Sequence, residues 1–261
     1  MPIFRLKKVW DYCSYNIPFF IFVLILIYIS MRIPDFSSNV YDSNVGTAVN
    51  WIISILLMGY GMSITRDRIN HGYRLPKIEI GDAIFLGIKA LIVFTFYLTI
   101  QGAILGFVAY LFDAPVFDLE ELFLNLNDYM HLLYAYPDLS ISFVLLEGFI
   151  FYVTTFFGEI GIARVADTKK LLSAFDLVAI IRSINIFGWR NYAKDLTSIV
   201  IALVILTYLQ SFLFPIPMLD NLWETFLGFL IFATQFLGIG AVYCKIKDKE
   251  KEMEKSQNDF D

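Results

Sequence analysis

The sequence predicts an all-α, polytopic membrane protein with six transmembrane helices arranged as three antiparallel hairpins. Three observations predict this class. Hydrophobic residues make up 58% of the 261-residue chain and the mean hydropathy is +0.65, whereas soluble domains are about 45–50% apolar. The apolar residues gather in six runs, most of them near the roughly 20 residues that a bilayer needs, and the third is longer. Lys and Arg lie almost entirely on alternate sides of these runs.

The basic residues predict the orientation of the chain. Eighteen of the 20 Lys and Arg residues precede the first run or follow the second, fourth and sixth runs. The exceptions are Arg32, at the end of the first run, and Lys89, in the third. Loops rich in Lys and Arg stay in the cytoplasm. We therefore expect a multi-pass protein of the cell membrane with both termini in the cytoplasm, and an uncleaved signal anchor at its start.

The predicted spans cover residues 17–33, 45–65, 79–112, 139–163, 196–214 and 222–244. The first is short, so we expect Arg32 to reach the outer interface by extending its side chain. Residues 34–44 are polar and are expected to form an outer loop. Residues 1–244 would then form a single membrane domain, and residues 245–261 a cytoplasmic tail too charged and too short to pack a core.

An outer segment, residues 113–138, has the pattern of an amphipathic helix. Asp118 and Glu121 have the spacing of a capping box, and apolar residues follow at helical intervals. We expect an acidic interfacial helix on the outer leaflet. It is either a solvated connector that covers the bundle, or a ligand lid or partner surface.

A second interfacial helix is predicted on the cytoplasmic side, over residues 174–185. Ser173 and Asp176 repeat the capping spacing, and a glycine follows the pattern. Asp176 and Ser183 would lie on the polar face of this helix, with Val178 on the apolar face.

Glycines recur where the chain re-enters the cytoplasm. The second and sixth spans end in G-x-G-x4-basic, the fourth in a looser version, and the third contains G-x-x-x-G. Glycine lets helix backbones approach closely in lipid, where packing replaces the hydrophobic driving force. We expect helix contacts at these glycines, the alternatives being chance or a hinge. The eight positions are Gly59, Gly61, Gly102, Gly106, Gly158, Gly161, Gly238 and Gly240.

Ionisable groups inside the membrane are the default place to look for function. Glu147 lies deep in the fourth span, with no basic residue at its predicted depth. It would be protonated, or hydrogen-bonded to Gln101. A structural role is one interpretation. The other is a proton- or cation-linked site, in which Glu147, Gln101 and Gln235 line the path of a small transporter or channel.

Two further charged residues lie near the cytoplasmic ends of their spans. Glu159 and Lys89 have similar predicted depths, so an ion pair between them is one expectation. Arg164 is the alternative partner of Glu159, because it follows on the same helix.

The sequence carries no motif of established chemistry. His71 and His131 stand alone on opposite predicted sides, and the two cysteines form no metal motif. No phosphate-binding loop or dinucleotide fingerprint is present. We therefore expect no enzyme activity, no cofactor, no metal and no nucleic-acid partner. The expected partners are the lipid bilayer and another membrane protein or a second copy of the chain.

Two stretches of the chain carry short motifs at predicted helix ends. The first consists of Gly59-Tyr60-Gly61, Arg66, Gly72-Tyr73-Arg74-Leu75-Pro76, Asp82 and Gly87-Ile88-Lys89-Ala90, and the second of Ile162-Ala163-Arg164-Val165-Ala166 and Ala174-Phe175-Asp176. Over about residues 45–245 the chain resembles the archaeal membrane proteins grouped as domain of unknown function 4013. It departs from them at Lys77, Ile78 and Ile80, where the family is more acidic.

The resemblance implies a multi-pass cell-membrane protein from an archaeon and brings no activity or site residues. From the sequence we expect a non-enzymatic scaffold or accessory subunit, with a small transporter or channel as the alternative.

Overall fold

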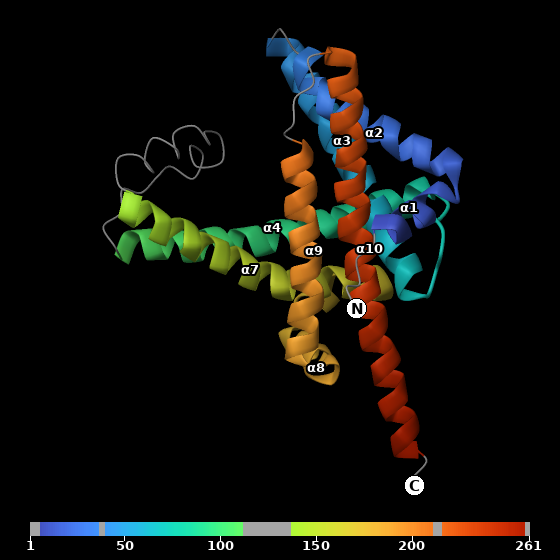
Figure 1. Ribbon diagram of the computed structural model, residues 1–261, viewed down its shortest axis with the longest axis vertical. Helices are drawn as coiled ribbons and strands as arrows, with labels where there is room; N and C mark the ends of the chain where they lie inside the picture. The colour runs from blue at the N-terminus through green and yellow to red at the C-terminus, as the bar shows by residue number, and fades with distance from the viewer. Residues whose placement is uncertain (1–5, 37–39, 112–136, 211–215, 259–261) are drawn as a thin grey trace. The chain divides into compact units, whose positions relative to one another are not determined.

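The computed structural model confirms the all-α class. It describes residues 6–36, 40–111, 137–210 and 216–258. These residues form eight α-helices and one 3₁₀ helix (Figure 1): α1 (Leu6–Ser14), α2 (Ile17–Phe36), α3 (Val40–Ile69), α4 (Ile80–Leu111), α7 (Pro137–Thr168), η1 (Leu171–Ala174), α8 (Leu177–Phe187), α9 (Trp189–Gln210) and α10 (Pro217–Asn258). The outer amphipathic helix is predicted on residues that lie almost entirely outside this description.

Five of the described helices are long and apolar enough to cross a membrane, which indicates a membrane protein. Their apolar spans are Val45–Ile69, Ile80–Phe107, Gly148–Thr168, Trp189–Gln210 and Met218–Ser256. The first predicted span differs, because the apolar part of α2, Ile17–Arg32, is shorter than the others. By length and composition the described residues therefore contain five such helices, and the six-span arrangement stays a prediction.

The helices extend beyond the apolar runs. α2 continues to Phe36 and α3 begins at Val40, so the prediction of an outer loop over residues 34–44 is wrong for most of that segment. α9 begins at Trp189 rather than near residue 196. Hydropathy identifies only the part of a helix that is apolar enough for the hydrocarbon layer. The helical backbone hydrogen bonds continue into the polar residues on either side, so the helices are longer than the apolar runs.

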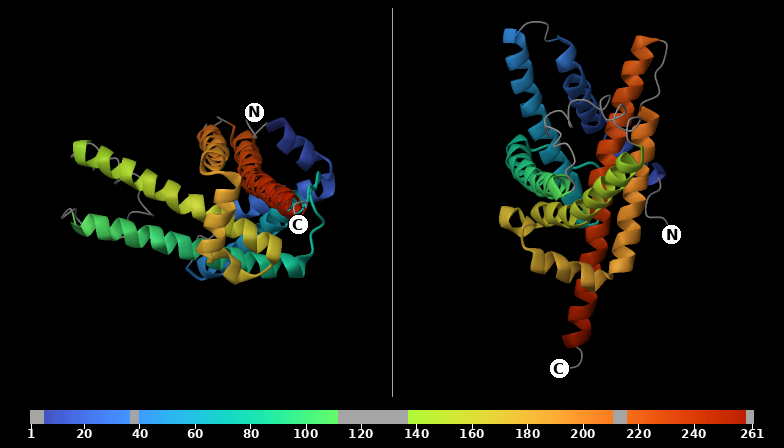
Figure 2. Two further views of the ribbon diagram at one scale, coloured as in Figure 1. Left: turned by 90° about the horizontal axis from the view of Figure 1, so that it is seen from below. Right: turned by 90° about the vertical axis from the view of Figure 1, so that its left-hand side faces the viewer.

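The chain divides into two compact units. Unit 1 consists of Met1–Leu91 and Glu159–Asp261, and unit 2 of Ile92–Gly158. α4 and α7 each belong partly to both units. Within unit 2, α4 and α7 run side by side (Figure 2), and the ring of Tyr97 in α4 contacts Gly158 in α7.

α10 is the central helix of unit 1. It packs along α3 and α9 and also contacts α1, α2 and α8 (Figure 1). A buried apolar cluster joins α10 to the first three helices. The partly buried ring of Phe20 packs edge to face on the buried ring of Phe229 in this cluster, with centroids 4.8 Å apart. The core of unit 1 is thus built around a single long helix.

A helix forms where the inner interfacial helix is predicted, but its start and faces differ from the prediction. Asp176 is the N-cap of α8, and a 3₁₀ turn occupies the predicted start. The helix ends at Gly188, whose φ of 94° favours glycine. Ser183 is buried and donates to Glu250 of α10 at 3.3 Å, whereas Val178 is 80% exposed. The buried face of α8 is mainly apolar, with Ile180, Ile184 and Phe187 beside Ser183.

α10 continues without a break into the predicted tail. Its 42 residues span about 63 Å at 1.5 Å per residue, roughly twice the hydrocarbon thickness of a bilayer. Ile246, in the predicted tail, is fully buried. The first turns of this charged segment therefore pack against other helices of unit 1, contrary to the expectation that it is too charged to pack.

Candidate functional site: the charged end of α10 and the Glu159 recess

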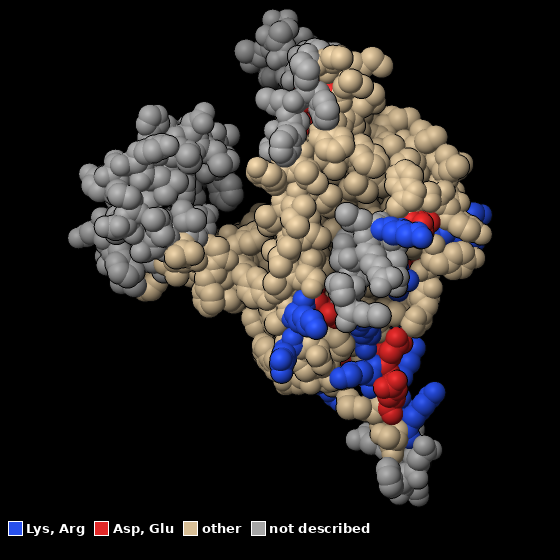
Figure 3. Space-filling model, in the orientation of Figure 1, with Lys and Arg blue, Asp and Glu red and all other residues tan. Residues whose placement is uncertain are grey.

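Charged side chains of unit 1 gather along the last turns of α10 (Figure 3). Three lysines at alternate positions of α10 bind three different helices. Lys247 donates to both carboxylate oxygens of Asp167 in α7, at 2.8 and 3.0 Å. Lys245 pairs with Asp195 of α9 at 3.0 Å. Lys249 donates to the carbonyl of Phe187, the last residue of α8, at 3.2 Å. We call residues 245–251 the charged end of α10.

The turn after α7 is held by side chains from two helices. Lys169 has a φ of 57°, an uncommon left-handed conformation for a residue with a side chain. Its ammonium pairs with Asp82 of α4, and its carbonyl accepts from Lys89 at 2.5 Å. Arg164 donates to the carbonyl of Ser173 at 3.0 Å. These contacts fix a strained turn from several directions.

The structure does not pair Lys89 with Glu159. Lys89 bonds the Lys169 carbonyl and lies 3.8 Å from the ring centroid of Phe85. Arg164, the alternative partner of Glu159, lies near Asp176 instead, at 3.9 Å. The turn after α7 attracts both cations because its carbonyl groups have no helical partners of their own.

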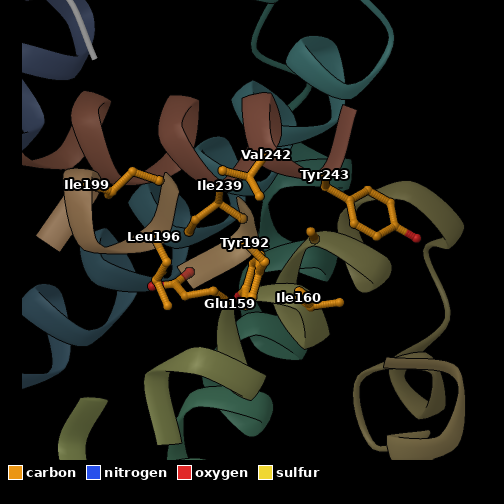
Figure 4. Close-up of a pocket in the computed structure, with 9 residues that line it drawn as sticks. Glu159, Ile160, Tyr192, Leu196, Ile199, Ile239, Val242 and Tyr243 are labelled. Atoms are coloured by element: carbon orange, nitrogen blue, oxygen red, sulfur yellow. The ribbon is translucent and has the colours of Figure 1, made fainter. Parts of the chain in front are cut away.

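Glu159 lines a small recess between α7, α9 and α10 (Figure 4). The recess has room for about one water molecule. Figure 4 shows the Glu159 carboxylate beside Leu196 and Tyr192, whereas the hydroxyl group of Tyr243 points away from it. Among the described residues the Oε2 atom of Glu159 is buried and accepts no hydrogen bond. Burying a carboxylate oxygen without a hydrogen bond costs free energy, which makes Glu159 a candidate functional residue of unit 1.

The three residues of the predicted transport path have different surroundings. Gln101 accepts a long hydrogen bond of 3.5 Å from Thr154 within unit 2. Gln235 is a partly buried residue of α10 in unit 1. Glu147 belongs to α7, and its side chain lies outside what the structure describes.

Four of the predicted glycines lie at close contacts between helices of unit 1. A Cβ atom at any of these positions would overlap a neighbouring atom. The pairs are Gly59 with Ala83, Gly61 with Phe236, Gly238 with Ile199, and Gly240 with Thr65 and Arg68. They connect α3 to α4, α3 to α10, and α10 to α9.

The other four glycines lie in different surroundings. A Cβ at Gly158 would make an ordinary contact with Tyr97 at 3.4 Å, and Gly161 is buried in α7. A Cβ at Gly102 or Gly106 would meet no described atom within 4 Å. The G-x-x-x-G of α4 therefore faces open space within the described part of the chain.

His71 lies beside Cys244, a proximity that sequence reasoning missed. The Nε2 atom of His71 lies 3.2 Å from Oδ1 of Asp248 and 3.8 Å from the Cys244 sulfur. The Cys244 sulfur lies 3.9 Å from Oδ2 of Asp248. Cys244 and Asp248 are one helical turn apart on α10, a spacing that was visible in the sequence, but His71 is 173 residues distant from Cys244.

The other cysteine has the surroundings of a structural residue. Cys13 in α1 is fully buried, and burial raises the pKa of its thiol to about 12. Its neighbour Tyr12 donates to Asp67 at 2.6 Å, and burial together with this hydrogen bond raises the pKa of the tyrosine. A thiol that stays protonated and covered at neutral pH is unreactive.

The long apolar helices and the charged side chains at their ends define the class, an all-α membrane protein. The model of one protein family, described as "Protein of unknown function (DUF4013)", matches residues 45–218, and the chain belongs to this family. No curated protein and no solved structure matches the chain.

Proposed function

We propose that this protein is a multi-pass integral protein of the cell membrane that acts as a non-enzymatic scaffold or accessory subunit. The observation that supports this role is that charged side chains connect the helices of unit 1 to one another. Lys245, Lys247 and Lys249 each bind a different helix of unit 1. Charges used in this way order a bundle, and they are not gathered around a cavity in which a substrate could react.

The proposal includes six spans with both termini in the cytoplasm, α2 being the shortest. The 20 residues of α2 extend about 30 Å, which matches the hydrocarbon thickness. Arg32, near the end of α2, forms an ion pair with Glu224 of α10 at 2.5 Å. Arg32 is the cation that the sequence predicts at the outer side, and Glu224 balances its charge.

The proposal also places α8 at the cytoplasmic interface of the membrane. Three apolar side chains of η1 and α8 are largely exposed: Leu172 by 79%, Val178 by 80% and Leu177 by 54%. The exposed Arg182 lies on the same helix. Exposed apolar side chains beside a cation suit the boundary between lipid and water.

Affinity purification from native membranes tests the scaffold role. The tagged full-length protein should bring down one membrane protein, or a second copy of itself, in a fixed ratio that survives gel filtration. Glu159→Gln should leave that ratio unchanged. Purification of a monomer without a companion under mild detergent conditions would contradict the role.

A small transporter or channel is the second candidate, and the buried oxygen of Glu159 favours it. Intramembrane carboxylates are common in proton and cation pathways. Purified protein in liposomes would then take up protons or sodium ions, and Glu159→Gln or Glu147→Gln would abolish the uptake. Glu252→Gln, at an exposed position of α10, is the matched control. Uptake no faster than in empty liposomes would exclude this candidate.

A further inference from the structure

His71 occupies a backbone position that usually requires glycine. The amide N–H of Gly72 donates to the Asp67 carbonyl at 2.8 Å, and that of His71 to the Arg68 carbonyl at 3.2 Å. These two bonds form the Schellman motif that closes α3. His71 lies at its left-handed position with a φ of 61°. A histidine here is less stable than a glycine, so its imidazole calls for another explanation.

The imidazole meets two further metal-ligating groups, both from α10. Its Nε2 atom lies 3.2 Å from Oδ1 of Asp248 and 3.8 Å from the Cys244 sulfur, and this sulfur lies 3.9 Å from Oδ2 of the same carboxylate. The edges of a zinc tetrahedron with sulfur, nitrogen and oxygen ligands are about 3.3–3.6 Å, from the usual bond lengths. One carboxylate oxygen, the imidazole nitrogen and the sulfur all lie within 4.8 Å of one another, so small side-chain movements would bring the three atoms onto one ion.

We propose that His71, Cys244 and Asp248 bind a divalent transition-metal ion of the zinc class. A thiolate and an imidazole select zinc-like ions over magnesium and calcium, and the carboxylate completes a mixed set of three protein ligands. A water molecule takes the fourth position of the tetrahedron. On binding, the Cys244 thiol loses its proton to solvent as the sulfur–metal bond forms. The thiolate and carboxylate together balance the charge of the ion.

The surroundings of the three residues allow an ion to enter. The side chains of His71 and Asp248 are 65% and 45% exposed, whereas Cys244 is buried. The ion reaches the exposed carboxylate and imidazole from water, and the buried sulfur binds it on the side that faces the protein interior. A bound ion would join the end of α3 to α10 at Cys244 and Asp248, so metal binding would stabilise the folded state.

Cobalt binding tests the proposal, because a cobalt–thiolate bond gives a charge-transfer band in the near ultraviolet. The full-length protein in detergent is stripped with a chelator and titrated with Co²⁺ alone. We expect a band that saturates at one cobalt per chain and disappears when Zn²⁺ is added, since zinc binds more tightly. Cys244→Ser should lose the band and Cys13→Ala should keep it. No band in the unmodified protein, or an equal band in Cys244→Ser, would overturn the proposal.

His71→Gly separates loss of a ligand from loss of folding. Glycine suits the left-handed position, so the metal-free variant should unfold at the same temperature as the unmodified protein or at a higher one. Its cobalt affinity should nevertheless fall by more than about 100-fold, the upper range for losing only a supporting residue. Unchanged cobalt affinity in this variant would refute His71 as a ligand and, with it, the site.

Discussion

Gly59 and Gly87 allow the backbones of α3 and α4 to touch. A Cβ at Gly59 would overlap the carbonyl oxygen of Ala83, and a Cβ at Gly87 would overlap that of Ile55. Each helix thus presents a glycine to a carbonyl group of the other. Backbone groups cannot rotate away as a side chain can, so neither position tolerates added volume.

We expect Gly59→Ala to destabilise the protein by about 1–3 kcal/mol, the usual range for an overpacked core. Gly102→Ala is the matched control, because its Cβ would meet no described atom within 4 Å, and it should cause no loss since alanine favours helix. Thermal unfolding in detergent measures both variants. Equal midpoints for the two would show that α3 and α4 do not approach at Gly59.

The glycine pattern predicted the right kind of residue but not its partner. Gly59 and Gly102 look alike in sequence, since each belongs to a short glycine motif within an apolar run. Only Gly59 faces another helix closely. The contact depends on which faces of two distant segments meet, and a periodic pattern in one segment carries no information about the other. His71 and Cys244 escaped prediction for the same reason.

α8 depends on a cap at each end. The Asp176 side chain accepts the backbone N–H of Ala179 at 3.0 Å, and Gly188 closes the helix with a positive φ. The helix has only 11 residues, which is short for a helix to persist without tertiary contacts. Its caps therefore contribute a large share of its local stability.

Asp176→Ala should destabilise the protein by about 0.5–2 kcal/mol, because the first turn of α8 loses its acceptor. Asp176→Asn should retain most of the stability, since asparagine caps helices as well as aspartate does. Denaturant or thermal unfolding with helix content as the probe measures the two. If asparagine were as harmful as alanine, the charge of Asp176 near Arg164 would be the important feature instead of the cap.

The ion pair between Asp167 and Lys247 connects α7 to α10. Their side chains are only 19% and 27% exposed, so water and salt screen the pair less than one at the surface. Lys251, in the same helix, is exposed. The two lysines therefore differ in surroundings although they lie about one helical turn apart.

Reversing one charge of this pair should destabilise the protein, and reversing both should restore part of the loss. We expect a coupling energy of about 0.5–3 kcal/mol between Asp167→Lys and Lys247→Asp in a double-mutant cycle. Lys251→Asp should change stability little. Additive effects of the two reversals would mean that the side chains act independently.

Sequence patterns located most helices, and their ends were harder to predict. The third element, expected over residues 79–112, is found as α4, Ile80–Leu111. α8 begins after Asp176 instead of Ser173, although both residues can cap a helix. In the structure Asp176 accepts the N–H of Ala179, whereas the Ser173 carbonyl accepts a hydrogen bond from Arg164. Such contacts exist only once the chain has folded.

The topology of the whole chain depends on whether α2 crosses the membrane. Within the described part of the chain, five helices meet the length and hydropathy of a span, and Ile17–Arg32 falls short. An odd number of spans would put the termini on opposite sides, whereas the distribution of Lys and Arg predicts that both lie in the cytoplasm. The first helix therefore decides the topology of the protein.

Labelling of single cysteines in oriented vesicles should resolve this question. In a protein with Cys13→Ala and Cys244→Ser, an impermeant maleimide should label Ser43→Cys only from outside and Lys170→Cys only from the cytoplasm. This result follows if α2 spans the bilayer and the basic turns stay inside. Labelling of both positions from the same side would disprove six spans.

The continuity of α10 bears on how this protein can be shortened or tagged. A chain cut after residue 244, where hydropathy alone would put the end of the domain, would lack Asp248 and the partners of Asp167, Asp195 and the Phe187 carbonyl. A purification handle or fluorescent reporter therefore belongs beyond Asn258. The shorter chain would lose the contacts that hold α7, α8 and α9 to α10. A poor yield of that chain would then reflect the truncation and not the behaviour of the native protein.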